Sequence, residues 1–372
     1  MDCRQIITSE EYGDFILPRN LVGINELSFP VDCELQVNEA YKIAYAKLPE
    51  NRQISLEDAG YPAIPKLFGL MDTDSMEQAG ILQVLNQPGL ALSGRNVLVG
   101  MIDTGIDYTH PAFRNPDGTT RILSIWDQTL TDEQAPSYVR YGKIFQQSDI
   151  DEALRGENPY EIVESRDENG HGTFLAGIAA GSPEEDGSFT GAAPGASLAV
   201  VKLKPAKRYL RDFFQIREDA LAYQENDIML GLVYLLVLAY TLKMPVVILL
   251  GLGSNSGTHS GYSPLSSVIR WAADKPQVVV VTAAGNEAGR QHHFQGRIEA
   301  EAAWQDVEVR VGEGERGFSM EIWAEAAEAY AISLTSPSGE VIPPISPRFG
   351  RSQELSFIFE QTRAYVDYEI VH

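Results

Sequence analysis

The pattern of hydrophobic and polar positions changes twice along the chain. Between about 75 and 290, near-continuous β-branched runs alternate with helical patterns. Strands that read as unbroken apolar runs are buried on both faces, which is typical of parallel sheets covered by helices. We therefore predict an α/β fold with a doubly wound parallel sheet. The expected strands are 96–103, 121–128, 197–204, 245–253 and 277–285, and the expected helices are 75–89, 171–181, 226–243 and 263–275.

The two ends of the chain follow other patterns. Residues 41–49 alternate like a strand and precede several prolines, which indicates a small N-terminal unit with a linker-like end. After about 297 the apolar positions recur at every second residue, as at 307–311 and 318–322, with turn residues between the runs. This period is typical of antiparallel strands in a β-sandwich. We predict three units with the boundaries 1–72, 73–296 and 297–372, the last being an incomplete, jelly-roll-like sandwich.

Charge and composition narrow the class of protein. The formal net charge is −23, whereas a nucleic-acid binder needs a basic surface that displaces counterions, so we expect no nucleic-acid partner. The uncharged run 228–242 is shorter than the roughly 20 residues of a membrane-spanning helix, so we expect a buried core helix and no membrane partner. The two cysteines, Cys3 and Cys33, lack metal-site spacing, and no apolar signal segment begins the sequence. We expect free thiols in a reducing compartment such as the cytoplasm.

Residues that can do chemistry follow the ends of the expected strands. Asp103 ends the strand 96–103, and Asn286 follows the strand 277–285. His171 begins a helix of small residues that can pack close to the sheet. Because ligand sites in such sheets lie at the carboxyl ends of the strands, the three side chains can meet in one cleft. An imidazole that a carboxylate orients is a general base, and an amide N–H₂ can stabilise an oxyanion.

Besides a strand end whose carboxylate orients a histidine, the triplet Asp103-Thr104-Gly105 has two other interpretations. An aspartic protease needs two such triplets on an all-β fold, or one in a short dimerising chain, and this sequence has one triplet in an α/β context. A Rossmann-type nucleotide binder needs a Gly-x-Gly-x-x-Gly turn after the first strand, and none is present. The pattern favours neither.

Three motifs taken together resemble the subtilisin-like serine proteases, or subtilases. The Asp motif is MIDTGIDYTHP (101–111), the His motif is NGHGTFLAG (169–177), and the oxyanion motif is AAGN (283–286). Their order along the chain is the order in that family. The resemblance covers about 75 to 290, and three motifs in order are far more specific than any one of them.

The resemblance implies a serine endopeptidase and a role for each residue. Asp103 would orient His171, His171 would act as general base toward a serine, and Asn286 would donate to the oxyanion. A polypeptide substrate would bind as an added strand. The residues that would line its binding site are Leu252, Gly253, Ser254, Ala284 and Gly285.

The sequence departs from the family pattern in three ways, of which the first two concern the nucleophile and calcium. The family's Gly-Thr-Ser nucleophile motif does not follow Asn286. We therefore expect the N-terminal portion of a longer protease, inactive by itself, with the serine beyond His372. The alternative is a catalytically inactive pseudoprotease that acts as a binding or signalling protein. Ala112 stands where many relatives carry a calcium-ligating Asp, and we expect no metal site and no cofactor.

The segment 127–167 is long for the family, and its acidic composition indicates a surface insertion, with a lid or partner site as the alternative. This insertion and the C-terminal β pattern resemble the clostridial subtilases that include spore-germination proteases. That resemblance implies that 1–72 is a prodomain which the enzyme cleaves itself, and that the protein is cytoplasmic or spore-associated.

Overall fold

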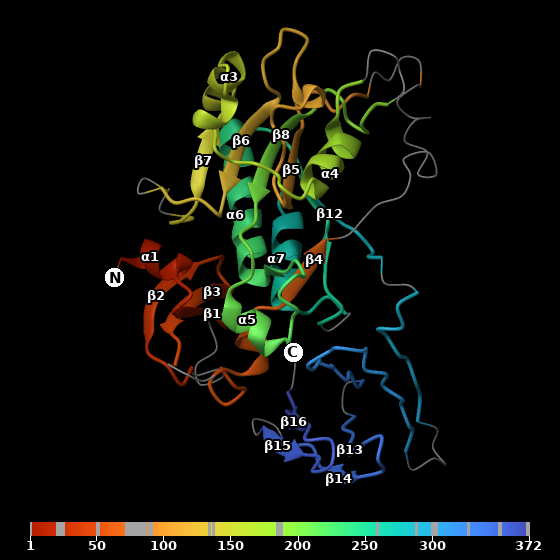
Figure 1. The fold of residues 1–372 in the computed structure, drawn as a ribbon. Helices are drawn as coiled ribbons and strands as arrows, with labels where there is room; N and C mark the ends of the chain where they lie inside the picture. Colours follow the sequence, from red (N-terminus) through yellow and green to blue (C-terminus); the bar gives the residue numbers. More distant parts are fainter. Residues whose placement is uncertain are drawn as a thin grey trace.

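A six-stranded sheet forms the centre of the fold, with the spatial order β12-β10-β5-β8-β6-β7 (Figure 1). All neighbouring strands are parallel except β6 and β7, which are antiparallel. The chain thus has the α/β fold that its β-branched runs predict. The strands are β5 (Leu98–Asp103), β6 (Ile122–Asp127), β7 (Lys143–Gln146), β8 (Ser197–Lys202), β10 (Val246–Leu250) and β12 (Val278–Thr282).

The computed structural model describes most of the chain. The helix expected at 75–89 lies outside the described residues, apart from Gln87. The described residues are 2–19, 27–49, 53–70, 87, 92–132, 135, 138–183, 189–257, 260–286, 289–298, 304–325, 328–348 and 352–369.

Helices cover both faces of the sheet. Successive side chains of a strand point to opposite faces, so an entirely apolar strand needs cover on each of them. Leu98 and Ile102 of β5 belong to the same apolar cluster as residues of α6 and α7. Val99 and Met101 of the same strand pack on the other face, in the cluster that contains residues of α3 and α4. The sheet is therefore doubly wound. The helices are α3 (Gln147–Arg155), α4 (His171–Ala180), α5 (Arg208–Phe213), α6 (Glu225–Leu242) and α7 (Pro264–Ala273).

Helix α6 contains the uncharged run that the sequence analysis assigned to the core. Within the described part of the chain it is the one helix whose length and hydropathy suit a membrane span, and 67% of that span is buried inside the protein. Leu232 and Leu235 have no exposed surface. This burial is typical of the central helix of an α/β domain.

The N-terminal unit packs against the α6 side of the sheet. Helix α1 (Cys3–Thr8) precedes a three-stranded antiparallel sheet of order β1-β3-β2. Ile43 and Tyr45 of this sheet join the apolar cluster of α6, and Phe15 packs in a second cluster with Leu210 of α5. The strands are β1 (Tyr12–Pro18), β2 (Val31–Gln36) and β3 (Tyr41–Lys47).

A buried ion pair also joins this unit to the α/β domain. Asp14 of β1 accepts a hydrogen bond from the ammonium of Lys207, and both side chains are almost fully buried. The second oxygen of Asp14 accepts from Gln224 at 3.1 Å and from Asn226 at 3.0 Å. Since buried charges need partners, this contact fixes the unit at one place on the domain.

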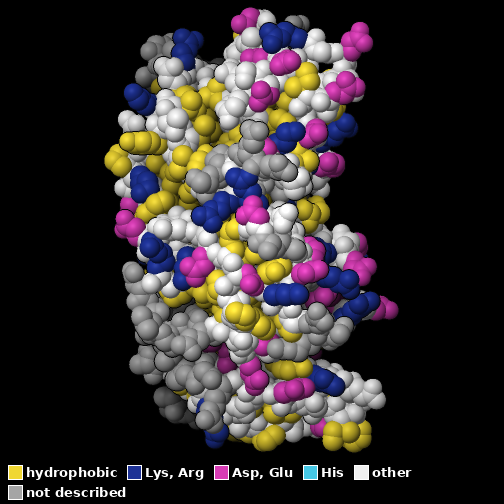
Figure 2. All heavy atoms as spheres, turned by 90° about the vertical axis from the view of Figure 1, so that its left-hand side faces the viewer, with side chains coloured by type: hydrophobic (Ala, Val, Ile, Leu, Met, Phe, Trp, Pro, Cys, Tyr) yellow, Lys and Arg dark blue, Asp and Glu magenta, His cyan; other side chains and the backbone are white. Residues whose placement is uncertain are grey.

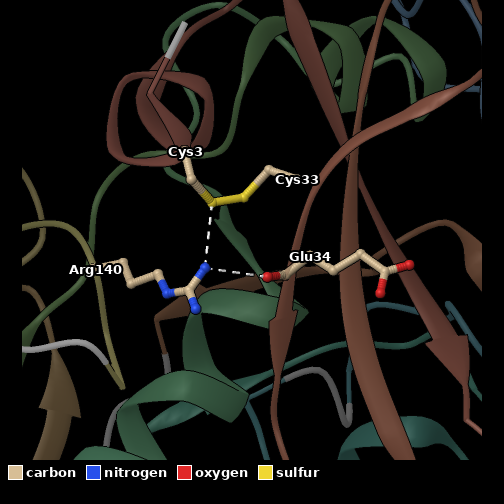
Figure 3. The surroundings of a disulfide bond; sticks show 4 residues. All are labelled: Cys3, Cys33, Glu34 and Arg140. Atoms are coloured by element: carbon tan, nitrogen blue, oxygen red, sulfur yellow. Dashed lines mark hydrogen bonds between the residues drawn. A yellow bond between two sulfur atoms is a disulfide. The ribbon is translucent and has the colours of Figure 1, made fainter.

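Cys3 and Cys33 form a disulfide that joins α1 to β2 (Figure 3). The prediction of free thiols is wrong, because the packing of α1 on β2 brings the two Cα atoms to 5.6 Å, although 30 residues separate them in sequence. The guanidinium of Arg140, from the α/β domain, donates to Cys3 Sγ at 3.6 Å and to the carbonyl of Glu34 at 3.4 Å. The inference of a reducing compartment loses its support.

The segment 127–167 contributes to the interior as well as to the surface. Strand β7 extends the central sheet by pairing with β6, and α3 follows it directly. Phe145 and Ile150 of these elements are buried. The interpretation as a surface insertion is therefore wrong for β7 and α3, because one apolar face of each packs against the sheet.

Among the described residues after 297, the strands form two antiparallel ribbons. Strand β13 (Ile332–Thr335) pairs with β14 (Val341–Ile345), and β15 (Gln353–Ser356) pairs with β16 (Arg363–Val366). A small apolar cluster around Ile342, Ile345 and Phe357 joins the two ribbons. The complete jelly-roll-like sandwich stays a prediction.

Two strands expected in this region are not formed. The described residues 304–325 contain no strand, although the apolar positions alternate there. Val309 and Ile322 are exposed, so the alternating side chains have no sheet to pack against. Alternation predicts a strand only where a partner strand accepts its hydrogen bonds.

Acidic and basic side chains mix on the surface of the molecule. Figure 2 shows one face, on which Lys and Arg lie between Asp and Glu over the whole height of the protein. The negative net charge is thus not gathered into one acidic patch on this face.

Candidate active site

Asp103 ends β5 with its carboxylate buried, 1% exposed. Strand β5 lies inside the sheet between β10 and β8, so the side chain at its carboxyl end is covered from both sides. The backbone N–H of Thr104 donates to Asp103 Oδ1 at 2.7 Å. The same oxygen lies 2.8 Å from Nδ1 of His171. The strand end therefore holds an imidazole against a buried carboxylate.

His171 is the first residue of α4, and its side chain is 12% exposed. Gly170, the residue before the helix, has a φ of 86°, a left-handed conformation that favours glycine. This conformation turns the chain sharply into the helix. The ring is thereby placed at the boundary between the sheet and solvent, with one nitrogen on Asp103.

The start of α4 packs unusually close to β5. A Cβ atom added to Gly172 would lie 2.2 Å from the carbonyl oxygen of Gly105, so no larger side chain fits there. Ala176 and Leu175, on the same side of the helix, are buried. Small residues thus determine how deeply α4 sits against the sheet, as the sequence pattern predicts.

Asn286 follows β12 and is exposed. Strands β12, β10 and β5 are neighbours and run parallel, so their carboxyl ends share one edge of the sheet. Asn286 therefore lies at the same edge as Asp103, two strands away. The structure brings Asp103 and His171 into contact and places Asn286 at that edge.

Two of the five residues predicted to bind a substrate strand pair with a strand of this chain. Leu252 and Gly253 form β11, which pairs antiparallel with β4 (Leu67–Leu70). On its other side β4 pairs with β9 (Tyr223–Gln224). The end of the N-terminal unit thus lies as an extended strand between two segments of the α/β domain.

A cavity of about 320 Å³ adjoins β11. Leu252 and Ser254 line it, whereas Ala284 and Gly285, which the sequence analysis assigned to the same pocket, are not among its lining residues. The remaining lining residues come mainly from the segment between β11 and α7 and from the first turns of α7.

Three carboxylates, those of Asp103, Asp167 and Glu168, affect the ionisation of a tyrosine near the site. Burial and the charges of Asp103, Asp167 and Glu168 raise the pKa of Tyr223 to about 12, so its hydroxyl remains protonated. Lys202 lies 2.9 Å from Glu168 and offsets part of this charge. Within the described ranges, no group of three or more His, Cys, Asp or Glu side chains is placed to hold a metal ion.

Asp167 and Thr104 also belong to the site, although neither was predicted from the sequence as a site residue. The hydroxyl of Thr104 donates to Asp167 Oδ1 at 2.7 Å and accepts from the N–H of Gly172 at 2.9 Å. The signal for these contacts is present, because an Asp before a helix start is a capping residue. The pairing with Thr104, 63 residues away, was visible only in the tertiary structure.

Comparison with known proteins gives three findings. Residues 94–338 match the profile of the Subtilase family. The chain is 31% identical over 135 residues to Subtilisin-like protease SBT2.2 of Arabidopsis thaliana. This alignment covers 32% of this chain and 16% of the plant protein. It is also 31% identical to the CspB protease of Clostridium perfringens, with a TM-score of 0.59, over 74% of this chain and 53% of that one. The chain thus spans about half the length of the CspB protease and less of the plant protein.

Proposed function

Because the chain belongs to the subtilase family, we propose that it is the Asp- and His-bearing portion of a serine endopeptidase. The observation that carries the proposal is the hydrogen-bond distance of 2.8 Å between Asp103 Oδ1 and His171 Nδ1. A general base needs an orienting carboxylate on one nitrogen and the nucleophile on the other. Membership of a family of serine-type peptidases and this geometry support the same chemistry.

Each residue then has a defined part in peptide-bond hydrolysis. Asp103 keeps the proton of His171 on Nδ1 and stabilises the imidazolium. His171 takes the proton of the serine hydroxyl through Nε2 and later gives it to the leaving amine. Asn286 donates its side-chain N–H to the oxyanion of the tetrahedral intermediate. In subtilisin, a family relative, the loss of this donor costs about 10²–10³-fold in kcat.

The nucleophile comes from polypeptide that this sequence does not contain. No Gly-Thr-Ser motif follows Asn286, and the chain spans about half of the CspB protease that it resembles. We propose that the serine lies on a segment next to the carboxyl ends of the strands, where His171 can reach it. By this proposal residues 1–372 alone do not hydrolyse peptides.

The N-terminal unit, residues 1–72, acts as a prodomain. Strand β4 pairs with Leu252 and Gly253 in the way that an extended substrate strand would. Substrate and prodomain therefore compete for the same backbone groups. We propose that the protease cleaves its own chain after this strand, and that polypeptide substrates then bind beside β11.

A fluorophosphonate probe, which reacts with activated serines, tests the proposal. It should label a longer polypeptide that carries the downstream segment and should not label residues 1–372. In the longer polypeptide, His171→Ala should abolish labelling, and mass spectrometry should show that the N-terminal unit stays attached. Labelling of residues 1–372 would place the nucleophile within this sequence. A longer, folded polypeptide that the probe does not label would instead support the pseudoprotease alternative.

A further inference from the structure

Asp167 is a half-buried carboxylate four residues before His171. Its Oδ1 accepts from the hydroxyl of Thr104 at 2.7 Å and from the N–H of Gly170 at 2.9 Å. Its Oδ2 accepts from the N–H of Thr173 at 2.8 Å and from the hydroxyl of the same residue at 2.6 Å. A carboxylate has about four acceptor positions, and here groups from the end of β5 and the start of α4 use all of them.

Thr104 connects this carboxylate to both members of the Asp–His pair. Its backbone N–H donates to Asp103 Oδ1, the oxygen that also faces His171. Its hydroxyl donates to Asp167 and accepts from the N–H of Gly172, the residue after His171. The residue after Asp103 and the residue after His171 are therefore joined by one hydroxyl, which Asp167 orients.

The start of α4 depends on a partner from outside the helix. The residue before the helix is Gly170, which has no side chain to satisfy the free N–H groups of the first turn. Asn169 accepts from the N–H of His171 at 3.3 Å, Thr104 accepts from that of Gly172, and Asp167 accepts from that of Thr173. The negative charge of Asp167 also lies at the positive end of the helix. Burial alone would raise the pKa of Asp167, but the hydrogen bonds from Thr173, Thr104 and Gly170 outweigh it and hold this pKa below its usual range.

We propose that Asp167 is a positioning residue, which holds the first turn of α4 at the depth where His171 Nδ1 meets Asp103 Oδ1. The inference deepens the proposed function and rests on it. Asp167 acts through Thr104 and the helix start, since its carboxylate accepts hydrogen bonds from Thr104, Gly170 and Thr173. Without it, His171 adopts orientations that leave Asp103, and fewer molecules have a correctly placed base.

The ring proton of His171 reports this geometry directly. A hydrogen bond to a buried carboxylate moves an imidazole N–H signal downfield in the NMR spectrum. In residues 1–372 labelled with ¹⁵N-histidine, we expect one such signal, which His171→Gln removes. This measurement requires no nucleophile, so it does not depend on catalysis.

Four variants separate positioning from simple helix capping. Asp167→Ala should abolish or broaden the downfield signal, and Thr104→Val, which keeps the side-chain shape, should weaken it. The double variant should lose no more than Asp167→Ala, because the two residues act as one unit. Asp149→Ala removes an acceptor from the start of α3, far from the site in sequence, and should leave the signal unchanged. A wild-type signal in Asp167→Ala would overturn the proposal. If that variant does not fold, a wild-type signal in Thr104→Val would overturn it.

Labelling of the longer polypeptide separates this inference from the proposed function. We expect the rate of fluorophosphonate labelling to fall at least tenfold in Asp167→Ala and to remain unchanged in Asp149→Ala. An equal rate in wild type and Asp167→Ala refutes the positioning role while the proposed function stands. If the wild-type polypeptide is not labelled at all, the proposed function fails, and the NMR signal of residues 1–372 still decides whether Asp167 positions the ring.

Discussion

The buried pair of Asp14 and Lys207 should stabilise the folded protein, because it joins the N-terminal unit to the α/β domain. Lys207 is 2% exposed and Asp14 is 0% exposed. Asp14→Ala removes the carboxylate and leaves the ammonium with the carbonyl of Tyr12, which accepts from it at 3.0 Å. The amides of Gln224 and Asn226 also lose an acceptor, although Gln224 keeps a bond of 3.2 Å to Asn226.

The unpaired ammonium dominates the cost of this change. Removal of one partner of a buried ion pair destabilises proteins by about 3–5 kcal/mol, because an uncompensated charge remains inside. Burial already lowers the pKa of Lys207, which shows that the site does not favour the charged form by itself. We therefore expect Asp14→Ala to lower the free energy of unfolding by about 3–5 kcal/mol.

Urea unfolding of residues 1–372, followed by circular dichroism, measures this loss. In Asp14→Ala/Lys207→Met neither charge of this pair remains, so the double variant should recover most of the stability. The matched control is Glu34→Gln, which breaks an ion pair of the same unit with Lys42, where the side chains are 47% and 31% exposed. An exposed pair of this kind contributes about 0.2–1 kcal/mol. If Asp14→Ala costs no more than Glu34→Gln, the buried pair does not hold the unit in place.

Two further predictions concern the helix that carries His171. Gly172→Ala should destabilise the protein by about 1–3 kcal/mol and abolish labelling of the longer polypeptide, because the new Cβ would lie 2.2 Å from the backbone oxygen of Gly105. The control Gly177→Ala adds a Cβ that meets nothing within 4 Å, so it should be neutral or stabilising. Equal thermal stability of the two variants would contradict the close packing. The pKa of the Asp167 carboxylate is lower in the folded protein than its usual value of 3.8. Its contribution to the free energy of unfolding is therefore complete above pH 3.8 and is lost as the pH falls through the folded pKa. The difference in unfolding free energy between wild type and Asp167→Asn should thus be constant between about pH 5 and 7 and shrink below pH 4, and a difference that grows with acid would show that the sign is wrong.

The amino-acid sequence by itself determined the central architecture. The β-branched runs around Met101 and Val280 became strands β5 and β12 of one sheet, and the uncharged run around Leu235 became its buried helix. These elements are predictable because an unbroken apolar run is stable in water only when both its faces are covered. Asp103 and His171 could be selected for the same reason, since each stands where such a run ends or begins.

The tertiary structure alone decided the contacts between segments that lie far apart in sequence. Local periodicity did not show that β4 would lie between β11 and β9, or that Cys3 would pair with Cys33. The alternation around Val309 predicted a strand, yet strand formation depends on a partner, and no partner packs there among the described residues. Asp167 could be expected to cap a helix. Its bond to Thr104 required the fold, because only the packing of α4 on the sheet brings a carboxylate of one segment to a hydroxyl at the end of another.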